Sequence, residues 1–394
     1  MYEKLFSKGK INGCVLRNRV ILSPMDDTLG TATGEISQRA IEYYAAKAKG
    51  GTGLIIVGYI AVVGPELGGI AMSGETHLIT LNDRHAMSIL AERVHEYGGK
   101  VFCQLNHPGR KTAPEYNEGH MPVSATAMPS KMVGKTALCH ELTVDEILHK
   151  YRSAQDKFIV ESFGTIAAYG GNAAMMHYHA TEEDHAKLER KGFLLVDCGG
   201  TYLDGTTDIT RTYPLGELTE DEKLFYTWTL QCHIDIAKAV WLNYCDGHML
   251  DTIAREPLWQ HLINYRCGTG HSVSFVGNVH EGPHALNGRN TTVFQPGMII
   301  TDEPGVYEAG QVGIRIENEL ECYHKADNQY GTFLAFRPLT FVPIATSPVV
   351  PGVLTRDELD WLNAYHREVF EKLAPRLNEE ERDWLAKKCA AIGA

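Results

Sequence analysis

The stretch LLVDCGGTYLDGTTDITRT, at residues 194–212, places two aspartates in short segments that the sequence predicts to be strands joined by glycine-rich turns. Three later segments each carry one further metal-binding side chain: CGTGHSVSF at 267–275, ITDEPGVY at 300–307 and GIRIENEL at 313–320. The candidate ligands are therefore Asp197, Asp208, His271, Glu303 and Glu317. Four carboxylates and one imidazole suit two adjacent divalent ions, and they supply the parts for metal-assisted hydrolysis.

The length, composition and net charge of the chain limit the classes of protein to which it can belong. The chain has 394 residues, enough for two domains, with 44% hydrophobic and 22% charged residues, which is ordinary for a globular protein. The formal net charge of −12 argues against nucleic acid or an anionic membrane as the main partner.

Cysteine usage and the apolar stretches point to a cytoplasmic protein. The nine cysteines are scattered, odd in number and never spaced as CxxC, which suits reduced thiols better than a disulfide framework. The opening MYEKLFSKGK lacks the apolar core of a signal peptide, and apolar stretches such as 53–63 fall far short of a membrane span. We therefore expect no membrane partner.

The first part of the chain alternates strand and helix patterns. This alternation predicts βα units and a parallel sheet with right-handed crossovers. Ser37 and Asn82 are the expected N-caps of the two helices. From 106 to 137 the chain is rich in Pro, Gly, Ser and Met and is predicted to be a long loop. The predicted strands are 19–24, 54–57 and 100–105, and the predicted helices are 37–49 and 82–97.

The pattern changes along the second part of the chain. Helices are expected to open with capping boxes, Thr143 with Glu146, Thr219 with Glu222 and Thr355 with Glu358. These helices and strands follow no regular βα alternation, so the sequence predicts an α+β fold around a largely antiparallel sheet. The expected domains are 1–145 and 146–394. The predicted strands are 194–196, 297–301, 313–317 and 340–343. Of the two long helices, one is expected from 220 to about 241, and the other is expected to begin after Thr355 and to end at about 373.

Two motifs near the N-terminus resemble the old yellow enzyme family of FMN-dependent NADH:flavin oxidoreductases. LFSKGKINGCVLRNRVILSPM, at 5–25, looks like the opening hairpin and first strand of that barrel, and QLNHPGR, at 104–110, looks like its third-strand signature. In the family, positions matching Pro24, Met25, Gly58 and Gln104 lie at the flavin. A closed (β/α)₈ barrel needs about 200 residues or more, and its phosphate site usually follows strands seven and eight. The resemblance implies a partial TIM barrel, which we expect not to hold FMN.

The segments around the candidate metal ligands resemble aminopeptidase P, the Xaa-Pro aminopeptidase branch of the pita-bread metallopeptidases. KYRSAQDKFIVESFGTIAAYGGNAAMMHYHA, at 150–180, looks like the entry to that domain. DCGGTYLDGTTDITRT, GTGHSVSFVGNVHEGP, ITDEPGVY and GIRIENE then follow in the order of the family. The resemblance covers the chain from about residue 150 to its end and implies a pita-bread fold with a dinuclear metal site.

The same resemblance implies a role for each ligand. The position of Asp197 binds one metal, those of Asp208 and Glu317 bridge both, and those of His271 and Glu303 complete the shell of the other. Mn, Co or Zn ions would share a bridging hydroxide that attacks the scissile carbonyl. The carboxylate of Glu303 is the candidate to take the proton of the water and to pass it to the leaving nitrogen.

Further residues flank the predicted centre. The family positions of His177 and His280 contact the substrate and stabilise the tetrahedral oxyanion. Arg315, two residues before Glu317, is expected to face the same side of a strand and to pair with a ligand carboxylate or with the substrate. Asp302 stands where the family commonly has Asn or an apolar residue, and it adds a negative charge beside an acidic site.

The sequence thus predicts a fusion of two unrelated enzymes, joined near residues 141–150. Our interpretation is a metalloaminopeptidase that acts on peptides with proline in the second position. Two alternatives stay open: an FMN-dependent oxidoreductase based on the first part, and a non-catalytic fusion whose pita-bread module binds peptides. We also expect self-association, because a partial barrel leaves a strand edge unpaired.

Overall fold

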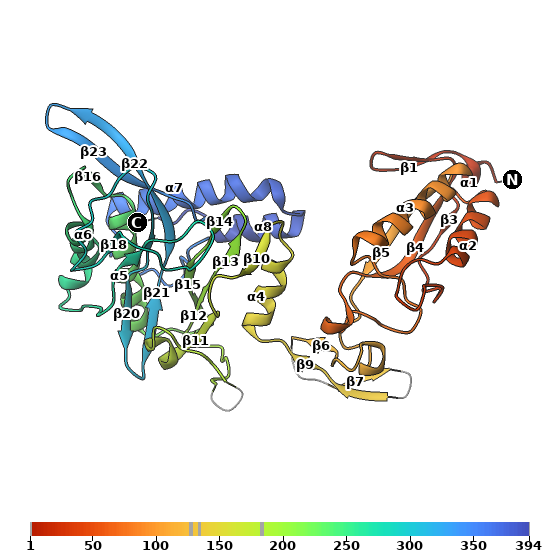
Figure 1. Cartoon of the computed structure of the whole chain (residues 1–394), viewed down its shortest axis with the longest axis horizontal. Coiled ribbons are helices and arrows are strands. Elements are labelled where there is room, and N and C mark those ends of the chain that lie inside the picture. Colours follow the sequence, from red (N-terminus) through yellow and green to blue (C-terminus); the bar gives the residue numbers. More distant parts are fainter. Residues whose placement is uncertain (1, 126–128, 133–134, 182–184, 394) are drawn as a thin grey trace. The chain divides into compact units, whose positions relative to one another are not determined.

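The computed structural model describes residues 2–125, 129–132, 135–181 and 185–393. The chain divides into two compact units, Met1–Thr143 and Val144–Ala394 (Figure 1). Because each unit has its own core, each is described by itself.

A three-stranded parallel sheet in the order β3-β4-β5 forms the centre of the first unit. Its strands are β3 (Ile21–Leu22), β4 (Leu54–Ala61) and β5 (Lys100–Asn106), and its helices are α2 (Gln38–Lys49) and α3 (Leu81–Glu96). Side chains of α2 and α3 pack with β4 in one hydrophobic cluster that includes Ile41, Tyr44, Val57 and Leu90. The predicted parallel βα units are therefore confirmed.

The caps of the two helices show one correct and one wrong prediction. Ser37 caps α2 by accepting from the backbone amide of Ala40. Asn82 was the wrong cap for α3, because Thr80 occupies that position and forms a capping box with Asp83. The hydroxyl of Thr80 and the carboxylate of Asp83 satisfy each other's backbone amides, so the helix begins at Leu81.

The predicted loop from 106 to 137 contains short regular elements. The short helix η2 (Pro114–Tyr116) precedes β6 (Val123–Ser124), which pairs in parallel with β9 (His140–Glu141). A hairpin of β7 (Pro129–Met132) and β8 (Lys135–Leu138) lies between them. Strands of two to four residues are too short to show a period in the sequence, which is why composition alone predicted a loop. Residues 126–128 and 133–134 of this predicted loop lie outside the described part.

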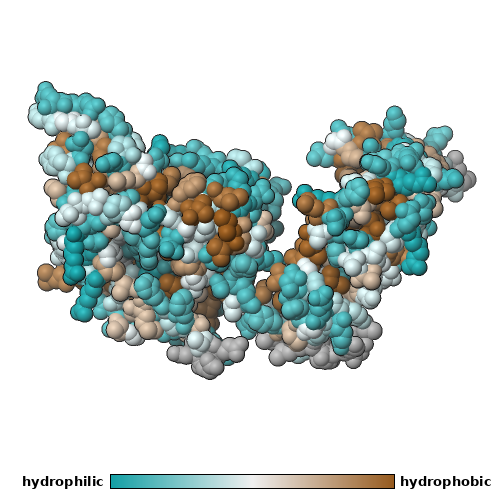
Figure 2. Space-filling model, in the orientation of Figure 1, coloured by the Kyte–Doolittle hydropathy of each residue, from teal (hydrophilic) through white to brown (hydrophobic). Residues whose placement is uncertain are grey.

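The first unit opens with a small hairpin, and β5 lies at a free edge of its sheet. Helix α1 (Glu3–Phe6) leads into β1 (Gly9–Ile11) and β2 (Cys14–Leu16), and η1 (Pro65–Leu67) follows β4. Within the described residues, β5 pairs with β4 alone. Leu105, near the end of β5, is 62% exposed, and Figure 2 shows hydrophobic residues in brown among hydrophilic ones on the visible face of this unit. Self-association through this edge stays a prediction.

Antiparallel sheets and long helices build the second unit, as expected for an α+β fold. Helix α4 (Val144–Ser153) begins directly after Thr143. One sheet has the order β10-β13-β14 and another the order β11-β12-β15. Their strands are β10 (Phe158–Glu161), β13 (Gly200–Tyr202), β14 (Gly205–Thr206), β11 (Ile166–Tyr169), β12 (Phe193–Cys198) and β15 (Ile209–Pro214), with the short helix η3 (Gly170–Ala174) after β11.

The largest sheet of the second unit has the order β16-β23-β22-β19, and two small pairs complete the strand set. The long hairpin of β22 and β23 was not predicted, because its outer half is exposed on both faces and lacks an apolar alternation. The strands are β16 (Val240–Leu242), β23 (Gly331–Pro338), β22 (Asn318–Asn328), β19 (Ile299–Asp302), β20 (Gly305–Glu308) with β21 (Val312–Arg315), and β17 (Gly270–His271) with β18 (Ala285–Leu286).

Two long helices begin at the predicted capping boxes. Helix α5 (Glu220–Ala237) starts after Thr219, and α7 (Arg356–Leu373) starts after Thr355, with both halves of each box formed. Helix α5 ends before the predicted residue 241, because 240–242 form strand β16. Helices α6 (Gly247–Trp259) and α8 (Glu379–Lys388) and the short η4 (Ala374–Arg376) complete the unit.

The predicted strand at 340–343 is wrong. The carbonyls of Thr340, Val342 and Pro343 accept hydrogen bonds from Arg211 or Tyr365 instead of joining a ladder. The segment is therefore held by buried side chains and not by a neighbouring strand.

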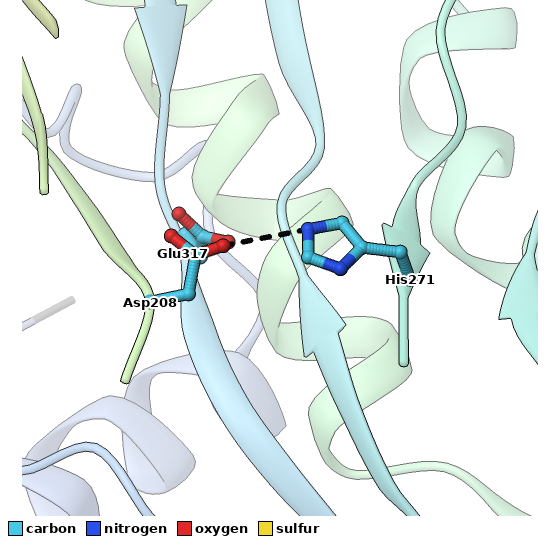
Figure 3. Close-up of side chains that lie close together, drawn as sticks. All are labelled: Asp208, His271 and Glu317. Atoms are coloured by element: carbon cyan, nitrogen blue, oxygen red, sulfur yellow. Dashed lines mark ion pairs between the residues drawn. The ribbon is translucent and has the colours of Figure 1, made fainter. Parts of the chain in front are cut away.

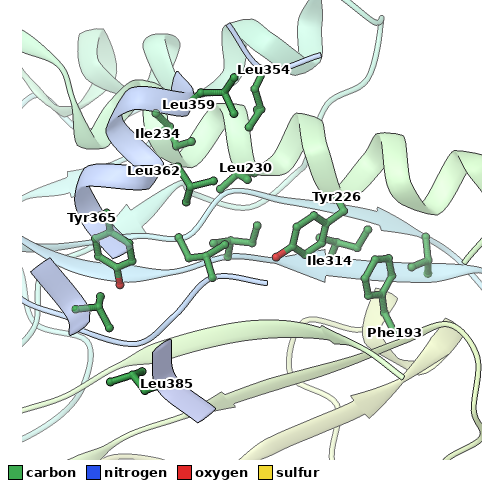
Figure 4. Close-up of a cluster of buried hydrophobic side chains, with 14 residues drawn as sticks. Phe193, Tyr226, Leu230, Ile234, Ile314, Leu354, Leu359, Leu362, Tyr365 and Leu385 are labelled. Carbon is green, nitrogen blue, oxygen red and sulfur yellow. The ribbon is translucent and has the colours of Figure 1, made fainter. Parts of the chain in front are cut away.

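Helices α5 and α7 pack their apolar faces against β21 and β12 to form the main core (Figure 4). Its largest members include Phe193, Tyr226, Leu230, Ile234, Ile314, Leu362 and Tyr365. A rigid core on this side fixes the strands from which the metal-ligand candidates project. Among the helices of the described ranges, none has both the length and the apolar character that a bilayer crossing requires.

Candidate metal centre

All five predicted ligands lie in the second unit, at the ends of separate strands. Asp197 lies on β12, and Asp208 directly precedes β15. His271 closes β17, while Glu303 follows β19 and Glu317 lies between β21 and β22. Antiparallel pairing of β12 with β15 and of β19 with β22 brings these ends to one place.

Three of these residues form the tightest group. Ligand atoms of Asp208, His271 and Glu317 all lie within 4.8 Å of one another. Figure 3 shows the imidazole of His271 pointing at the two carboxylates, with Nε2 lying 3.4 Å from Asp208 Oδ2. The same nitrogen lies 3.3 Å from Glu303 Oε1, so a fourth ligand candidate joins the group.

Arg315 connects the fifth candidate to the others. Its Nη2 lies 2.5 Å from Asp197 Oδ2, and its Nε lies 3.9 Å from Glu303 Oε2. The side chain of Arg315 is almost fully buried, and its Nη1 donates to the hydroxyl of Tyr307 at 3.0 Å. One buried cation thus faces two of the candidate carboxylates.

Two threonines that we did not predict orient the ligands. Thr210 Oγ1 donates to Glu317 Oε2 at 2.6 Å and accepts from Arg315 Nε at 3.0 Å. Thr301 Oγ1 donates to Glu303 Oε1 at 3.1 Å and accepts from the backbone amide of His271 at 2.9 Å. The sequence spacing could have predicted these threonines. Each stands two residues from a ligand candidate, and residues two apart on an extended segment face the same side.

Three acids of this cluster, Asp197, Glu303 and Glu317, have raised pKa values. Burial raises the pKa of Asp197 to about 6, an effect that Arg315 partly offsets, and burial raises that of Glu303 to about 7. The pKa of Glu317 lies well above its usual range because the carboxyl is buried and faces Asp208 and Glu303. Each raised value reflects negative charge that lacks enough positive charge nearby.

The donor set fits divalent cations. Asp197 Oδ1 and Glu317 Oε1 are buried oxygens with no hydrogen-bond partner among the described residues. Buried acceptors without a donor are costly unless a cation binds them. Oxygen donors with one imidazole match the ligands that Mn, Co and Zn ions accept.

The flanking histidines lie at the exposed side of the cluster. The rings of His271 and His280 meet edge to face with centroids 4.1 Å apart. Burial would lower the pKa of His271, yet Asp208 and Glu303 raise it overall, whereas burial and the neighbouring His271 lower the pKa of His280. His177 acts on His280 electrostatically, and the side chains of His177 and His280 are both exposed.

Asp302 does not add charge on the metal side, contrary to the expectation from sequence. Its carboxylate is fully buried and lies against His233 of α5. Consecutive residues of a strand point to opposite faces, so Asp302 faces away from the cluster that Glu303 joins.

The four predicted flavin positions lie in the first unit. Met25 and Gln104 are exposed and Pro24 is half-buried. A Cβ on Gly58 would lie 2.5 Å from the Met25 amide and from Pro24 Cβ, so this glycine lets the 23–25 turn approach β4. These positions supply a turn and one amide side chain but no cation for a phosphate, and no flavin chemistry follows from them.

Comparisons with known proteins agree with both resemblances. Residues 122–323 match the model of metallopeptidase family M24, and 332–392 match the C-terminal region of that peptidase family. Residues 4–174 match the NADH:flavin oxidoreductase / NADH oxidase family, so the two family matches overlap at residues 122–174. The two recognised resemblances are therefore confirmed.

Individual relatives match nearly two thirds of the chain. Aminopeptidase P2 from Arabidopsis thaliana is 43% identical over 259 residues, which are 64% of this chain and 36% of that protein. Aminopeptidase P1 from Lotus japonicus is 41% identical over 259 residues, 64% of this chain and 39% of that protein. The chain thus spans about two fifths of the length of these relatives.

A solved structure shares the fold. It is an X-prolyl aminopeptidase from Caenorhabditis elegans, described as a cytosolic enzyme with a dinuclear active site. The identity is 38%, the TM-score is 0.60, and the match covers 63% of this chain and 42% of the other. Since the M24 match alone spans just over half of the residues, the chain belongs to metallopeptidase family M24.

Proposed function

We propose that the second unit hydrolyses the peptide bond between an N-terminal residue and a following proline, with two divalent ions. The observation that carries this proposal is the convergence of His271 with the carboxylates of Asp208, Glu303 and Glu317. The names of the plant and nematode relatives support the choice of substrate.

The five ligand candidates divide between the two ions. We assign the ligands as follows: Asp197 would hold one ion, His271 and Glu303 would hold the other, and Asp208 and Glu317 would contribute to both. When bound, such ions lower the pKa of a water molecule and polarise a carbonyl oxygen. Manganese, cobalt and zinc all suit the donors, and the identity of the native ion is open.

Glu303 is the residue that we assign to proton transfer. A general base must lie within hydrogen-bond reach of the water that it deprotonates, and the Glu303 carboxylate lies beside His271 in the cluster where that water would bind. Its side chain is partly exposed, so the carboxylate can take a proton from water and pass it to the leaving nitrogen. Thr301 holds the carboxylate in place by donating to Oε1.

The residues around the ligands would position the substrate. We assign His280 and His177 to contacts with the peptide and with the oxyanion, since both side chains are exposed, His280 packs against His271 and His177 acts electrostatically on His280. Arg315 keeps Asp197 ionised and oriented, and its burial leaves it no contact with bulk water. By analogy with the nematode enzyme we also propose a cytosolic location.

A paired substrate assay tests this function. We expect the manganese-loaded protein to release the first residue of Ala-Pro peptides and to act far more slowly on matched Ala-Ala peptides. Equal rates on both would refute the proline preference, and no release from either would refute the peptidase activity.

A further inference from the structure

Glu303 and Glu317 lie just beyond the same end of the paired strands β19 and β22. In the antiparallel ladder of β19 and β22, Asp302 lies directly opposite Asn318, and this is the last pair. Glu303 and Glu317 are the next residue along each strand, and their backbone amides bond to residues outside this ladder. The separation of the two carboxylates therefore depends on how firmly the last pair is held.

His233 of α5 bridges this last pair on the face away from the cluster. Its Nδ1 lies 3.0 Å from Asp302 Oδ2 and 3.2 Å from the carbonyl oxygen of Asp302. Its Nε2 lies 3.2 Å from Asn318 Nδ2. Carboxylate and carbonyl oxygens only accept, so Nδ1 carries a proton and Nε2 accepts from the Asn318 amide. All three residues are fully buried.

Arg211 fixes the direction of the Asn318 amide. Arg211 Nη2 donates to Asn318 Oδ1 at 2.8 Å, and the hydroxyl oxygen of Tyr365 lies 3.3 Å from the same amide oxygen. A flipped amide would place its NH₂ group against the donors of the guanidinium. The hydrogen bonds therefore run in one direction, from Arg211 through Asn318 and His233 to Asp302.

The same arginine anchors the strand that follows Asp208. Arg211 lies on β15, next to Thr210, and its Nη1 donates to the backbone carbonyl of Glu317. Its Nε and Nη2 also donate to the carbonyls of Pro343 and Val342. One buried guanidinium thus ties β15 to the start of β22.

These four residues form a continuous buried chain, which we call the relay: Arg211, Asn318, His233 and Asp302. We propose that the relay is a positioning device that sets the separation of Glu303 and Glu317 for two ions. This inference rests on the proposed dinuclear function and adds residues that act through the ligands. Buried hydrogen bonds hold their donors and acceptors in fixed positions, and removing one member of the relay leaves its neighbours without partners.

Calorimetric titration of the full chain with Mn²⁺ tests the relay. His233→Leu keeps a similar volume but removes both hydrogen bonds, whereas His233→Gln retains one donor and one acceptor. We expect His233→Leu to weaken manganese binding by about 10- to 100-fold, as partners of metal ligands typically do. His233→Gln should recover most of the affinity.

A second buried histidine supplies the matched control. His366 of α7 is also fully buried, and its Nε2 accepts from the Ile344 amide at 3.1 Å. His366→Leu should lower the melting temperature and leave the manganese affinity unchanged. Should His233→Leu fail to fold, Asn318→Asp carries the same test, because Asp keeps the acceptor for Arg211 but cannot donate to His233.

The outcomes separate the inference from the proposed function. If His233→Leu, or Asn318→Asp in its place, bound two ions with the affinity of the parent, the relay would have no positioning role and the proposed function would stand. If the parent chain bound no manganese, the proposed function would fall and the inference with it.

Discussion

Both units carry sequence motifs of known enzymes, but the fold brings the motif residues together and buries them only in the second unit. In the second unit, side chains from β12, β15, β17, β19 and β22 or their ends converge on one acidic cluster, and a buried layer of hydrogen bonds supports it. In the first unit, Gly58 and Gln104 lie within strands of a three-stranded sheet, Pro24 and Met25 follow its first strand, and Met25 and Gln104 are exposed. A motif supplies chemistry only where the surrounding fold orients and buries its residues.

Buried polar contacts account for much of this difference. Arg315, Thr210 and Thr301 each hold a ligand carboxylate by a hydrogen bond or an ion pair. At the flavin positions of the first unit, Gly58 serves close packing against the 23–25 turn. The comparison predicts that metal binding and active-site changes will act on the second unit alone.

The largest effect should come from the proton-transfer residue. Glu303→Gln is nearly isosteric but cannot carry a proton, so we expect Xaa-Pro hydrolysis to fall by at least about 10³-fold with the fold retained. Steady-state kinetics with circular dichroism measure this change. Glu321→Gln, on the neighbouring strand β22 and paired with Arg337, is the control and should keep parent activity. Glu303→Gln activity within about tenfold of the parent would show that the assignment is wrong.

Metal binding should stabilise one unit and not the other. At a manganese concentration about 100-fold above Kd, each bound ion adds about 2.7 kcal/mol to the stability of the second unit. This corresponds to a rise of about 5–10 °C in its melting temperature. Differential scanning calorimetry should show the transition of the first unit unmoved. A rise of both transitions by the same amount would contradict the separation of the units.

Acid should destabilise the second unit through His366. Burial lowers the pKa of His366 to about 4 from an ordinary value near 6.5, with Arg211 adding to the effect. Between these values the unfolded chain binds a proton that the folded chain does not, so stability falls as the pH falls. Between pH 7 and 4.5 the parent should lose about 2–3 kcal/mol more than His366→Gln. Urea unfolding of the metal-free proteins measures this, and equal losses would speak against a buried neutral histidine.

The smallest expected effect is the absence of bound flavin in the first unit. After purification and dialysis we expect no visible absorbance near 450 nm, because Pro24, Met25, Gly58 and Gln104 are not accompanied by a phosphate site. Metal bound to the second unit, measured in the same sample, shows that the dialysed protein is still folded. One equivalent of flavin that survives dialysis would overturn this expectation.

The sequence predicted the ligand candidates because each lies in a short motif whose local context is informative. Asp197 and Asp208 sit in one glycine-rich stretch, and the capping boxes at Thr219 and Thr355 marked helix starts correctly. Such signals depend on neighbours within a few residues.

The supporting residues could not be found in the same way. His233 and Asn318 meet across a separation of 85 residues, and Arg211 reaches Asn318 across 107. Their roles depend on which strands pair, which local patterns do not determine. The strand prediction at 340–343 was wrong for the same reason, because the carbonyls of this segment accept hydrogen bonds from distant side chains and do not join a β-ladder.

The metal content of the folded chain tests the central claim most directly. Protein purified with Mn²⁺ present and then dialysed should contain about two manganese ions per chain by elemental analysis, because the five ligand candidates offer enough donors for two ions. Asp208→Asn, which alters a ligand facing both ions, should retain fewer. A folded, dialysed parent protein with no bound metal would contradict the account.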